Sequence, residues 1–343
     1  MERSAERPIL AIDLGGTQIR SALVTSDRTV HCRRAVPTAD EEGVEAVLGR
    51  IVAVAVAVRD EAAADGLPAP IGVGISSPGP LDPWRGIVRA APNLKGWTNI
   101  PLGPMVADGL GMPTFLERDT NVAVMGEWCY GAARGTSNAI YITVSTGIGG
   151  GLILGGRPIV GSNGTAGEVG HIVVELDGPQ CGCGGIGHVE AIGSGTALAR
   201  EGRALVAEHP DSLLARLAAD VTEVDAQLVA RAAEEGDARA AALLERAWVA
   251  VGALVASLVN LLDPEVIVIG GSIAAHHPRL FDVVAVEMKR RAFPILLDKV
   301  RIVPAALGGD VSLIGSLPIV NDRIDDPAYA PGSVPTQQGA PLS

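Results

Sequence analysis

Residues 161–190 hold the side chains of this chain that are best suited to chemistry. Nine glycines in this stretch accompany two imidazoles, two thiols and the two carboxylates that bracket these four side chains in sequence. These six side chains belong to Glu168, His171, Cys181, Cys183, His188 and Glu190. Two thiolates and two imidazoles form a complete tetrahedral ligand set for zinc. The pattern predicts a metal-ordered loop that presents both carboxylates to a polyhydroxylated ligand. The alternative is a glycine-rich surface loop in which the Cys and His residues are incidental.

The composition indicates a soluble enzyme. With 343 residues, 48% of them hydrophobic, the chain can bury two sizeable cores. A net charge of −12 argues against a nucleic-acid surface. The N-terminus lacks the apolar stretch of a signal peptide, and the longest apolar run, 247–262, is shorter than the roughly 20 residues that span a bilayer. Because Cys181 and Cys183 are too close for an ordinary disulfide, we expect a reducing, cytoplasmic compartment. From the net charge and the short apolar run, we expect no nucleic-acid or membrane partner.

The two halves of the chain repeat one order of elements. In the first half we expect strands at 9–14, 19–24, 31–36 and 71–76, with a helix at 41–64 whose alternating IVAVAVAV core also fits a strand. In the second half we expect strands at 139–144, 151–154, 266–269 and 300–304, and helices at 196–208, 225–235, 237–262, 279–292 and 310–320. Residues 323–343, rich in Pro, Gly and Ser, predict a disordered tail. The repeated plan indicates two α/β domains that face one cleft.

Glycine turns at the ends of the expected strands suggest phosphate binding. Gly15, Gly16 and Thr17 follow the first strand, where bare backbone N–H groups and a hydroxyl can approach phosphate oxygens, while Asp13 suits a magnesium ion. An ordinary hairpin is the alternative for this turn alone. A second turn, 145–151, lies at the equivalent place in the second half and contains Thr146, Gly147 and Gly149. A third pair, Gly270 and Gly271, offers bare backbone to a nucleoside. Neither a Walker P-loop nor a dinucleotide fingerprint occurs.

Five motifs together resemble the ROK sugar-kinase family. They are DLGGT at 13–17, STGIGGG at 145–151, GSNGTAGEVGH at 161–171, CGCGGIGHVE at 181–190 and LGGDVSLIGS at 307–316. The resemblance runs from about residue 8 to 322. It implies the fold shared by hexokinase, actin and Hsp70, namely two α/β actin-like ATPase (ribonuclease H-like) domains flanking a cleft. We expect a domain at 1–118, completed by a helix at about 309–322, and a second domain at 119–308.

The resemblance also implies a reaction and roles for individual residues. Family members transfer phosphate from Mg-ATP to a sugar hydroxyl, usually the 6-hydroxyl of a hexose, and Asp119 in ERDTN matches the general base. The implied sugar contacts are Glu168, His171 and Glu190, with Gly79, Asn93 and Arg118 contributing less. The implied ATP and magnesium contacts are the residues of the three glycine turns. We expect a structural zinc on His171, Cys181, Cys183 and His188, and a homodimer or a dimer of dimers.

Two positions depart from the family pattern. His188 stands where the family usually has a third cysteine, so the zinc site becomes Cys₂His₂ unless His188 is not a ligand. Arg118 stands where an asparagine usually precedes the base, and its guanidinium can donate hydrogen bonds but cannot accept them. Arg118 either reaches sugar hydroxyl oxygens or turns away to pair with a carboxylate such as Glu117.

Glucose is the expected substrate. N-acetylmannosamine, fructose, mannose and allose are the alternatives, and a non-catalytic sugar sensor is a remote one. Sugar-responsive repressors of the family carry a DNA-binding domain before the kinase-like body. Here Asp13 lies too near the start for such a domain to precede it.

Overall fold

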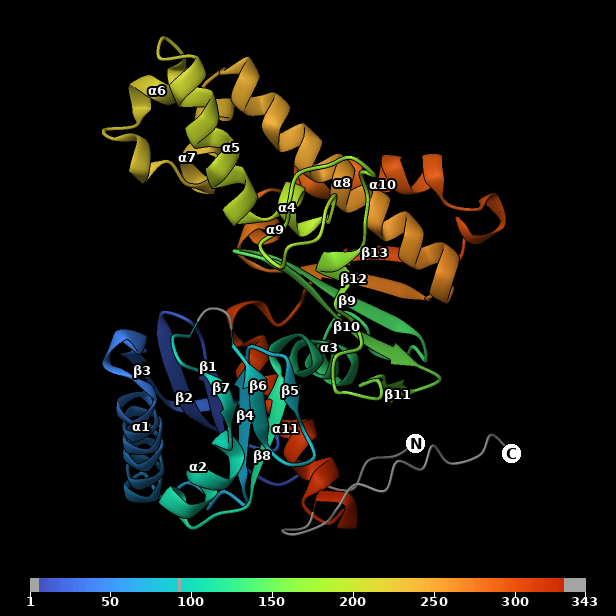
Figure 1. The fold of residues 1–343 in the computed structure, drawn as a ribbon. Helices are drawn as coiled ribbons and strands as arrows, with labels where there is room; N and C mark the ends of the chain where they lie inside the picture. The colour runs from blue at the N-terminus through green and yellow to red at the C-terminus, as the bar shows by residue number, and fades with distance from the viewer. Residues whose placement is uncertain (1–5, 92–93, 330–343) are drawn as a thin grey trace. The chain divides into compact units, whose positions relative to one another are not determined.

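The computed structural model of the protein describes residues 6–91 and 94–329. The chain divides into two compact units (Figure 1). Of the described residues, the first contains 6–91, 94–134, 158–166 and 309–329, and the second contains 135–157 and 167–308. The first unit therefore extends past the expected boundary at residue 118, because helix α3 (Asp119–Tyr130) packs against helix α11 (Val311–Arg323). Gly315 permits this approach, since a Cβ there would meet the carbonyl oxygen of Val122.

A mixed five-stranded sheet forms the centre of the first unit. Its strands run in the order β3-β2-β1-β4-β8. They are β1 (Ile9–Leu14), β2 (Gln18–Val24), β3 (Val30–Pro37), β4 (Val73–Ser77) and β8 (Thr114–Arg118). The first three form an antiparallel meander, while β4 and β8 are parallel to β1. The carboxyl ends of β1, β4 and β8 therefore share one edge of the sheet.

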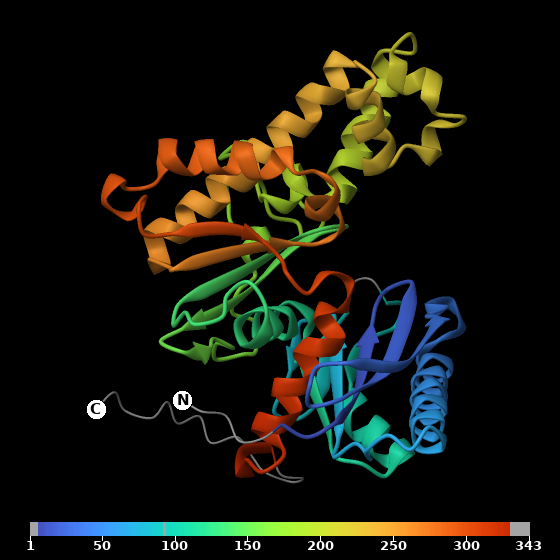
Figure 2. The same ribbon diagram turned by 180° about the vertical axis from the view of Figure 1, so that it is seen from behind.

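Helices cover both faces of this sheet. On one face, Leu10, Ile12 and Leu14 share a core with α1 (Val44–Ala64) and α2 (Leu102–Leu110). On the other face lie α3 and α11. Helix α11 is the red helix that crosses the blue and cyan strands in Figure 2. The approach of α11 is close: a Cβ at Gly74 of β4 would lie 2.8 Å from the Cβ of Ser316. A small antiparallel sheet of β5 (Leu81–Asp82), β6 (Ile87–Ala90) and β7 (Thr98–Ile100) completes the unit.

The second unit repeats the same sheet plan. Its strands run in the order β11-β10-β9-β12-β13. They are β9 (Ala139–Val144), β10 (Ile148–Leu154), β11 (Arg157–Pro158), β12 (Val266–Gly270) and β13 (Arg301–Pro304). As in the first unit, the hairpin β9–β10 is antiparallel, and the β9–β12 and β12–β13 pairs are parallel. The repeated order of elements predicted from the sequence is thus present in the structure.

The helices of the second unit form two cores. They are α4 (Glu190–Gly193), α5 (Gly195–Glu208), α6 (Leu213–Leu217), α7 (Ala226–Glu234), α8 (Ala238–Leu262), α9 (Ser272–His276) and α10 (Arg279–Arg291). Helix α8 is long and apolar enough by length and composition to cross a membrane. Its residues from Ala247 to Val259, however, pack with α10 and with the strands in the larger core. The smaller core joins α5, α6 and α7 to the beginning of α8.

Two expectations about local structure are wrong. The returning strand of the second unit begins at Ile148 rather than Gly151, because Gly149 and Gly150 pair with β9 instead of forming a turn. The expected disordered tail at 323–343 does not begin at Arg323. Arg323 is the last residue of α11 and is buried, and a 3₁₀ turn follows at Pro327–Tyr329. Residues 330–343 of the expected tail lie outside the described residues.

Candidate active site

Asp119 lies at the carboxyl edge of the first unit's sheet. Strand β8 ends at Arg118 and helix α3 begins at Asp119, so the carboxylate sits on the positive end of the helix. Its side chain is exposed, and its Oδ1 accepts a hydrogen bond of 2.7 Å from the N–H of Thr120. Open α/β sheets bind ligands beyond the carboxyl ends of their parallel strands. The position suits a carboxylate that accepts a proton from a bound ligand.

The first glycine turn joins β1 to β2 at the same edge. The turn is tight because the N–H of Gly15 donates to the carbonyl of Gln18 at 3.0 Å, and a Cβ at Gly15 would lie 2.9 Å from that oxygen. Gly16 and Thr17 are exposed, as a phosphate site requires. Asp13 is paired with Arg20, whose Nη2 lies 2.6 Å from Oδ2. A magnesium ion at Asp13 would therefore share the carboxylate with this guanidinium.

Arg118 turns into the protein rather than toward solvent. It is 3% exposed, and its Nη2 donates to the carbonyl of Ala166 and, at 3.3 Å, to Oδ1 of Asn121. Its aliphatic stem lies 3.3 Å from the position of a Cβ at Gly79, so a side chain at Gly79 would crowd the arginine. The bond to Ala166, which neither alternative for Arg118 included, anchors the segment 158–166. Asn93 lies outside the described residues.

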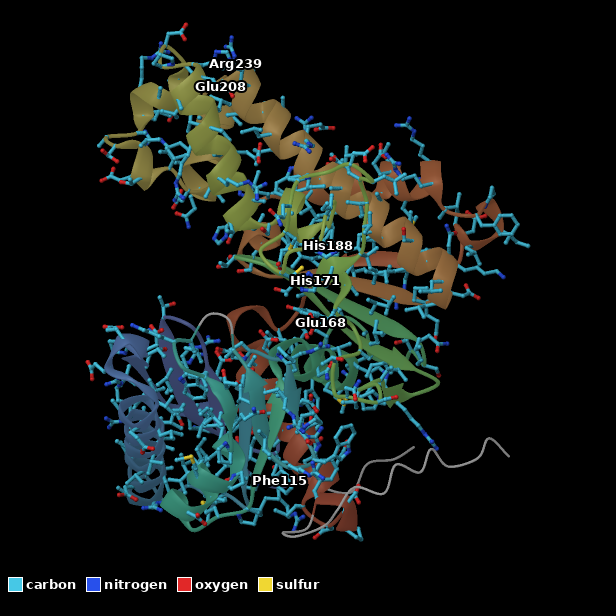
Figure 3. All side chains as sticks on the ribbon, in the orientation of Figure 1. Phe115, Glu168, His171, His188, Glu208 and Arg239 are labelled. Atoms are coloured by element: carbon cyan, nitrogen blue, oxygen red, sulfur yellow. The ribbon has the colours of Figure 1, made fainter. Side chains whose placement is uncertain are left out.

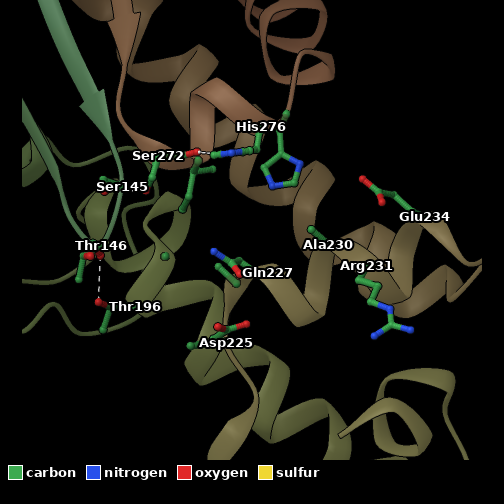
Figure 4. Close-up of a pocket in the computed structure, with 15 residues that line it drawn as sticks. Ser145, Thr146, Thr196, Asp225, Gln227, Ala230, Arg231, Glu234, Ser272 and His276 are labelled. Carbon is green, nitrogen blue, oxygen red and sulfur yellow. Dashed lines mark hydrogen bonds between the residues drawn. The ribbon is translucent and has the colours of Figure 1, made fainter. Parts of the chain in front are cut away.

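The second glycine turn borders a cavity of about 670 Å³ inside the second unit (Figure 4). The turn and the start of α5 are tied together. Gly195 N–H donates to the carbonyl of Ser145 at 2.8 Å, and the hydroxyl of Thr196 donates to the carbonyl of Thr146 at 2.9 Å. The 14-residue helix α5 thus directs its positive end at the turn. This is a favourable place for phosphate.

Polar side chains from α7 and α9 complete the cavity wall. They are Asp225, Gln227, Arg231, Glu234, Ser272 and His276. Asp225 caps α7 by accepting from the N–H of Leu228 at 2.8 Å. Burial lowers the pKa of the adjoining His277 below its ordinary value of 6.5, so its imidazole is neutral at neutral pH. The volume falls within the roughly 300–1,000 Å³ of small-molecule sites.

The remaining glycines singled out in the sequence have packing roles. Gly149 lies within β10, opposite Thr143. A Cβ at Gly270 would meet the hydroxyl of Tyr141, and one at Gly271, whose φ is +93°, would meet the carbonyl of Val144. Neither Gly270 nor Gly271 lines the cavity; Ser272 and Ile273, which follow them, do.

The four expected zinc ligands converge in the second unit. The ligand atoms of His171, Cys181, Cys183 and His188 all lie within 4.8 Å of one another. Cys181 Sγ is 3.9 Å from His171 Nδ1, and Cys183 Sγ is 3.3 Å from His188 Nδ1. Tetrahedral zinc with these donors needs ligand atoms about 3.3–3.8 Å apart. The four residues therefore fit the ion in donor type, the two sulfur–nitrogen separations lie at or close to this range, and His188 belongs to the cluster.

The loop that carries these residues is held in shape by its backbone. Cys181 N–H donates to the carbonyl of Gly185 at 2.8 Å, and Val173 forms an isolated β-bridge with His188. Gly185 leaves room for the ring of His188, which a Cβ would overlap. Burial raises the pKa of the Cys181 thiol, so metal binding must displace its proton.

The two glutamates adjoin this cluster on different sides. Figure 3 shows Glu168 beside His171, whose Nε2 lies 4.0 Å from Glu168 Oε2. Glu190 connects the cluster to the second glycine turn: its Oε2 accepts from the N–H of Ile148 at 3.0 Å, and its Oε1 lies 3.8 Å from Cys181 Sγ. The structure thus brings Glu168, His171, Glu190 and the zinc ligands together within the second unit.

Comparison with known proteins identifies the family. The model of the ROK family matches residues 9–323. The chain belongs to the ROK family. It is 35% identical over 316 residues to the glucokinase of Thermotoga maritima, covering 92% of this chain and 98% of that protein. It is 31% identical over 265 residues to the N-acetylmannosamine kinase of Escherichia coli, covering 77% and 82% respectively.

A solved structure of the ROK family supports the fold assignment. The ROK family glucokinase from Streptomyces griseus, in complex with glucose and AMPPNP, superposes with a TM-score of 0.77 at 30% identity, covering 91% of this chain and 98% of that one. The expected actin-like α/β fold is therefore confirmed.

Sequence reasoning about this ROK protein missed most of the cavity wall. Asp225, Gln227, Arg231 and Glu234 come from one turn and helix that carry no recognisable motif. The available signal was weak: Asp225 precedes an amphipathic stretch and reads as an ordinary helix cap. Glu117 and Arg323, a buried ion pair in the first unit, were missed as well.

Proposed function

We propose that this protein is an ATP-dependent hexose kinase that phosphorylates the 6-hydroxyl of glucose. The observation that carries the proposal is the cavity in the second unit, bordered by a glycine turn and the positive end of α5, in a chain of the ROK family. The 35% identity with a glucokinase over almost the whole length favours glucose. N-acetylmannosamine is the main alternative substrate, because a kinase for that sugar is 31% identical; fructose, mannose and allose follow.

ATP would place its nucleoside in the cavity. The carboxylates of Asp225 and Glu234 can accept hydrogen bonds from ribose hydroxyls or a base amino group. The phosphates would contact Thr146 and Gly147 in the second unit and Gly15, Gly16 and Thr17 in the first, with magnesium near Asp13. Gly149, Gly270 and Gly271 would contribute through the backbone geometry that they permit.

Asp119 is proposed as the general base. Its carboxylate accepts the proton of the sugar 6-hydroxyl while the hydroxyl oxygen forms a bond to the γ-phosphorus and the bond to ADP breaks. Its place at the positive end of α3 favours a negatively charged side chain at this position. A base of this kind contributes about 10²–10⁴-fold to the rate.

The sugar would be recognised mainly by Glu168, His171 and Glu190. Carboxylates suit a neutral polyol, because each accepts several hydroxyl donors. Gly79, Asn93 and Arg118 are proposed as lesser contributors. Arg118 contributes indirectly, through its bond to Ala166.

A structural zinc is proposed on His171, Cys181, Cys183 and His188. With four protein ligands, the ion supplies rigidity to the loop and takes no part in phosphoryl transfer. It would fix the ring of His171 with Nδ1 toward the metal and Nε2 toward Glu168. We further propose a cytoplasmic protein that works as a homodimer or a dimer of dimers, without a nucleic-acid or membrane partner.

The test is ADP release from Mg-ATP with glucose, mannose, fructose, allose and N-acetylmannosamine, comparing wild type with Asp119→Ala. We expect glucose to be preferred, and Asp119→Ala to lose about 10²–10⁴-fold in kcat while still binding sugar in calorimetry. Preference for another hexose would replace the substrate but not the mechanism. Absence of turnover from folded, zinc-loaded protein would favour a sugar sensor.

A further inference from the structure

A buried carboxylate two residues before Asp119 has no part in the proposed reaction. Glu117, near the end of β8, is 2% exposed. A buried charge is costly unless it is paired and hydrogen-bonded. The partners of Glu117 therefore indicate what this carboxylate does for the fold around it.

One oxygen of Glu117 binds both residues that flank the proposed base. Its Oε1 accepts from the backbone N–H of Arg118 at 2.9 Å and from Nδ2 of Asn121 at 2.9 Å. Arg118 precedes Asp119 in the chain, and Asn121 follows it in the first turn of α3. One carboxylate thus fixes both sides of the junction from which the Asp119 side chain projects.

The other oxygen of Glu117 is bound by a distant arginine. Arg323, at the end of α11 and 206 residues further along the chain, donates from Nη2 to Glu117 Oε2 and from Nη1 to the carbonyl of Leu116 at 3.1 Å. Burial by itself lowers the pKa of Arg323, but the charge and hydrogen bond of Glu117, together with the neighbouring Tyr329 and Asp322, raise it above its ordinary value, so the guanidinium stays charged.

The 3₁₀ turn after α11 covers this ion pair. The ring of Tyr329 lies 4.5 Å from the guanidinium carbon of Arg323, and its centroid is 6.3 Å from that of Phe115 on β8. These contacts hold the turn over the charged pair and limit the access of water to it.

We propose that Arg323 is a positioning residue for Asp119, which acts by holding Glu117 against Arg118 and Asn121, and that Tyr329 shields this pair. The inference rests on the proposed role of Asp119 as the base. Without the guanidinium, the buried carboxylate would turn toward water and release the two flanking residues. The Asp119 carboxylate would then lose its alignment with the acceptor hydroxyl.

The experiment compares Arg323→Met with the double variant Glu117→Gln/Arg323→Met, in the full-length protein. In the double variant the neutral amide oxygen can still accept from Arg118 and Asn121, and no charge is left unpaired. We expect the single variant to lose about tenfold or more in kcat with KM for sugar and ATP within about twofold, and the double variant to recover most of the loss. Arg34→Met is the control. It removes the Arg34–Glu61 ion pair, which lies half exposed on the surface of the same unit, and we expect it to keep wild-type kcat.

The outcomes separate this proposal from the proposed function. If Arg323→Met keeps full kcat while Asp119→Ala is inactive, the positioning role is wrong and the base assignment stands. If the double variant is as slow as the single one, Arg323 does not act through Glu117. If the single variant fails to fold and the folded double variant is active, the rescue supports the proposal. Tyr329→Ala should lower kcat, though less than Arg323→Met does. Tyr329→Phe, which keeps the ring, should have wild-type kcat. Equal kcat values for wild type, Tyr329→Ala and Tyr329→Phe would exclude shielding.

Discussion

A methyl group at Gly147 in the second glycine turn should displace the carboxylate of Glu190. A Cβ there would lie 2.7 Å from Glu190 Oε2, closer than carbon and oxygen approach each other in proteins. The same oxygen accepts the hydrogen bond from Ile148 N–H at 3.0 Å. Gly147 does not have a positive φ, so Gly147→Ala adds no backbone strain. The substitution therefore acts by displacing one carboxylate that we propose to contact the sugar.

The size of the effect follows from the hydrogen bond that the displaced Glu190 carboxylate would no longer make to a sugar hydroxyl. A hydrogen bond to a charged group contributes about 1.5–3 kcal/mol. Because about 1.4 kcal/mol corresponds to a factor of ten, we expect kcat/KM for glucose to fall about 10- to 100-fold in Gly147→Ala. Coupled measurement of ADP release at varied glucose and fixed saturating Mg-ATP gives this ratio.

A matched control separates this effect from a general cost of alanine. Gly49 lies in α1, has no positive φ and has nothing within 4 Å of its Cβ position, so Gly49→Ala should keep full activity and raise the melting temperature slightly. Glu190→Ala and the double variant Gly147→Ala/Glu190→Ala should be equally slow, since both lack the placed carboxylate. Wild-type kcat/KM in Gly147→Ala would refute the reasoning, and so would additive losses in the double variant.

Three further predictions follow from the structure. Desalted protein should contain about one zinc per chain by elemental analysis, and Cys183→Ser should lower both the zinc content and the melting temperature; wild-type protein without zinc would overturn the assignment. Arg118→Asn loses the bond to Ala166, so we expect kcat for the best sugar to change little and the ranking of hexoses to change; an unchanged ranking would show that the anchor does not affect recognition. Asp237 caps α8, and although burial alone raises its pKa, hydrogen bonds from the N–H groups of Leu214, Ala240 and Arg239 lower it below the ordinary 3.8. Asp237→Ala should therefore cost about 1–2 kcal/mol at pH 7 in urea unfolding, and because a lowered pKa stabilises the fold only above the unfolded value, this difference should shrink as the pH falls below about 3.8; a pH-independent difference would contradict the capping role.

Two mostly apolar strands, β1 and β9, were predictable to the residue. The buried strand β4 was expected at 71–76 and lies at Val73–Ser77. The helix α1 was predictable despite its alternating valines, because Ile51, Val54, Ala55 and Val58 recur at helical spacing and are buried. β10 was not, since Gly149 and Gly150 carry no strand propensity. A Cβ at Gly150 would lie 2.7 Å from Val169, so close packing explains that glycine.

The candidate site was predictable where one local stretch supplies it and not where distant segments meet. His171, Cys181, Cys183 and His188 lie within one loop, so their spacing alone indicated a metal cluster. The pairing of Glu117 with Arg323 spans 206 positions, and neither residue lies in a pattern that suggests the other. The bond from Arg118 to the carbonyl of Ala166 likewise joins residues 48 positions apart, and no local pattern indicates it.

The division of the chain has a consequence for its biosynthesis. The first unit needs β1 at residues 9–14 and α11 at residues 311–323, so β1 leaves the ribosome long before the helix that packs against it. Meanwhile the face of β4 around Gly74, which α11 later covers, stays open to solvent or to a chaperone. The second unit, drawn from residues 135–157 and 167–308, can fold during this delay. A premature stop codon ahead of α11 would thus release a chain in which the second unit and its cavity are complete and the first unit, which carries Asp119, is not.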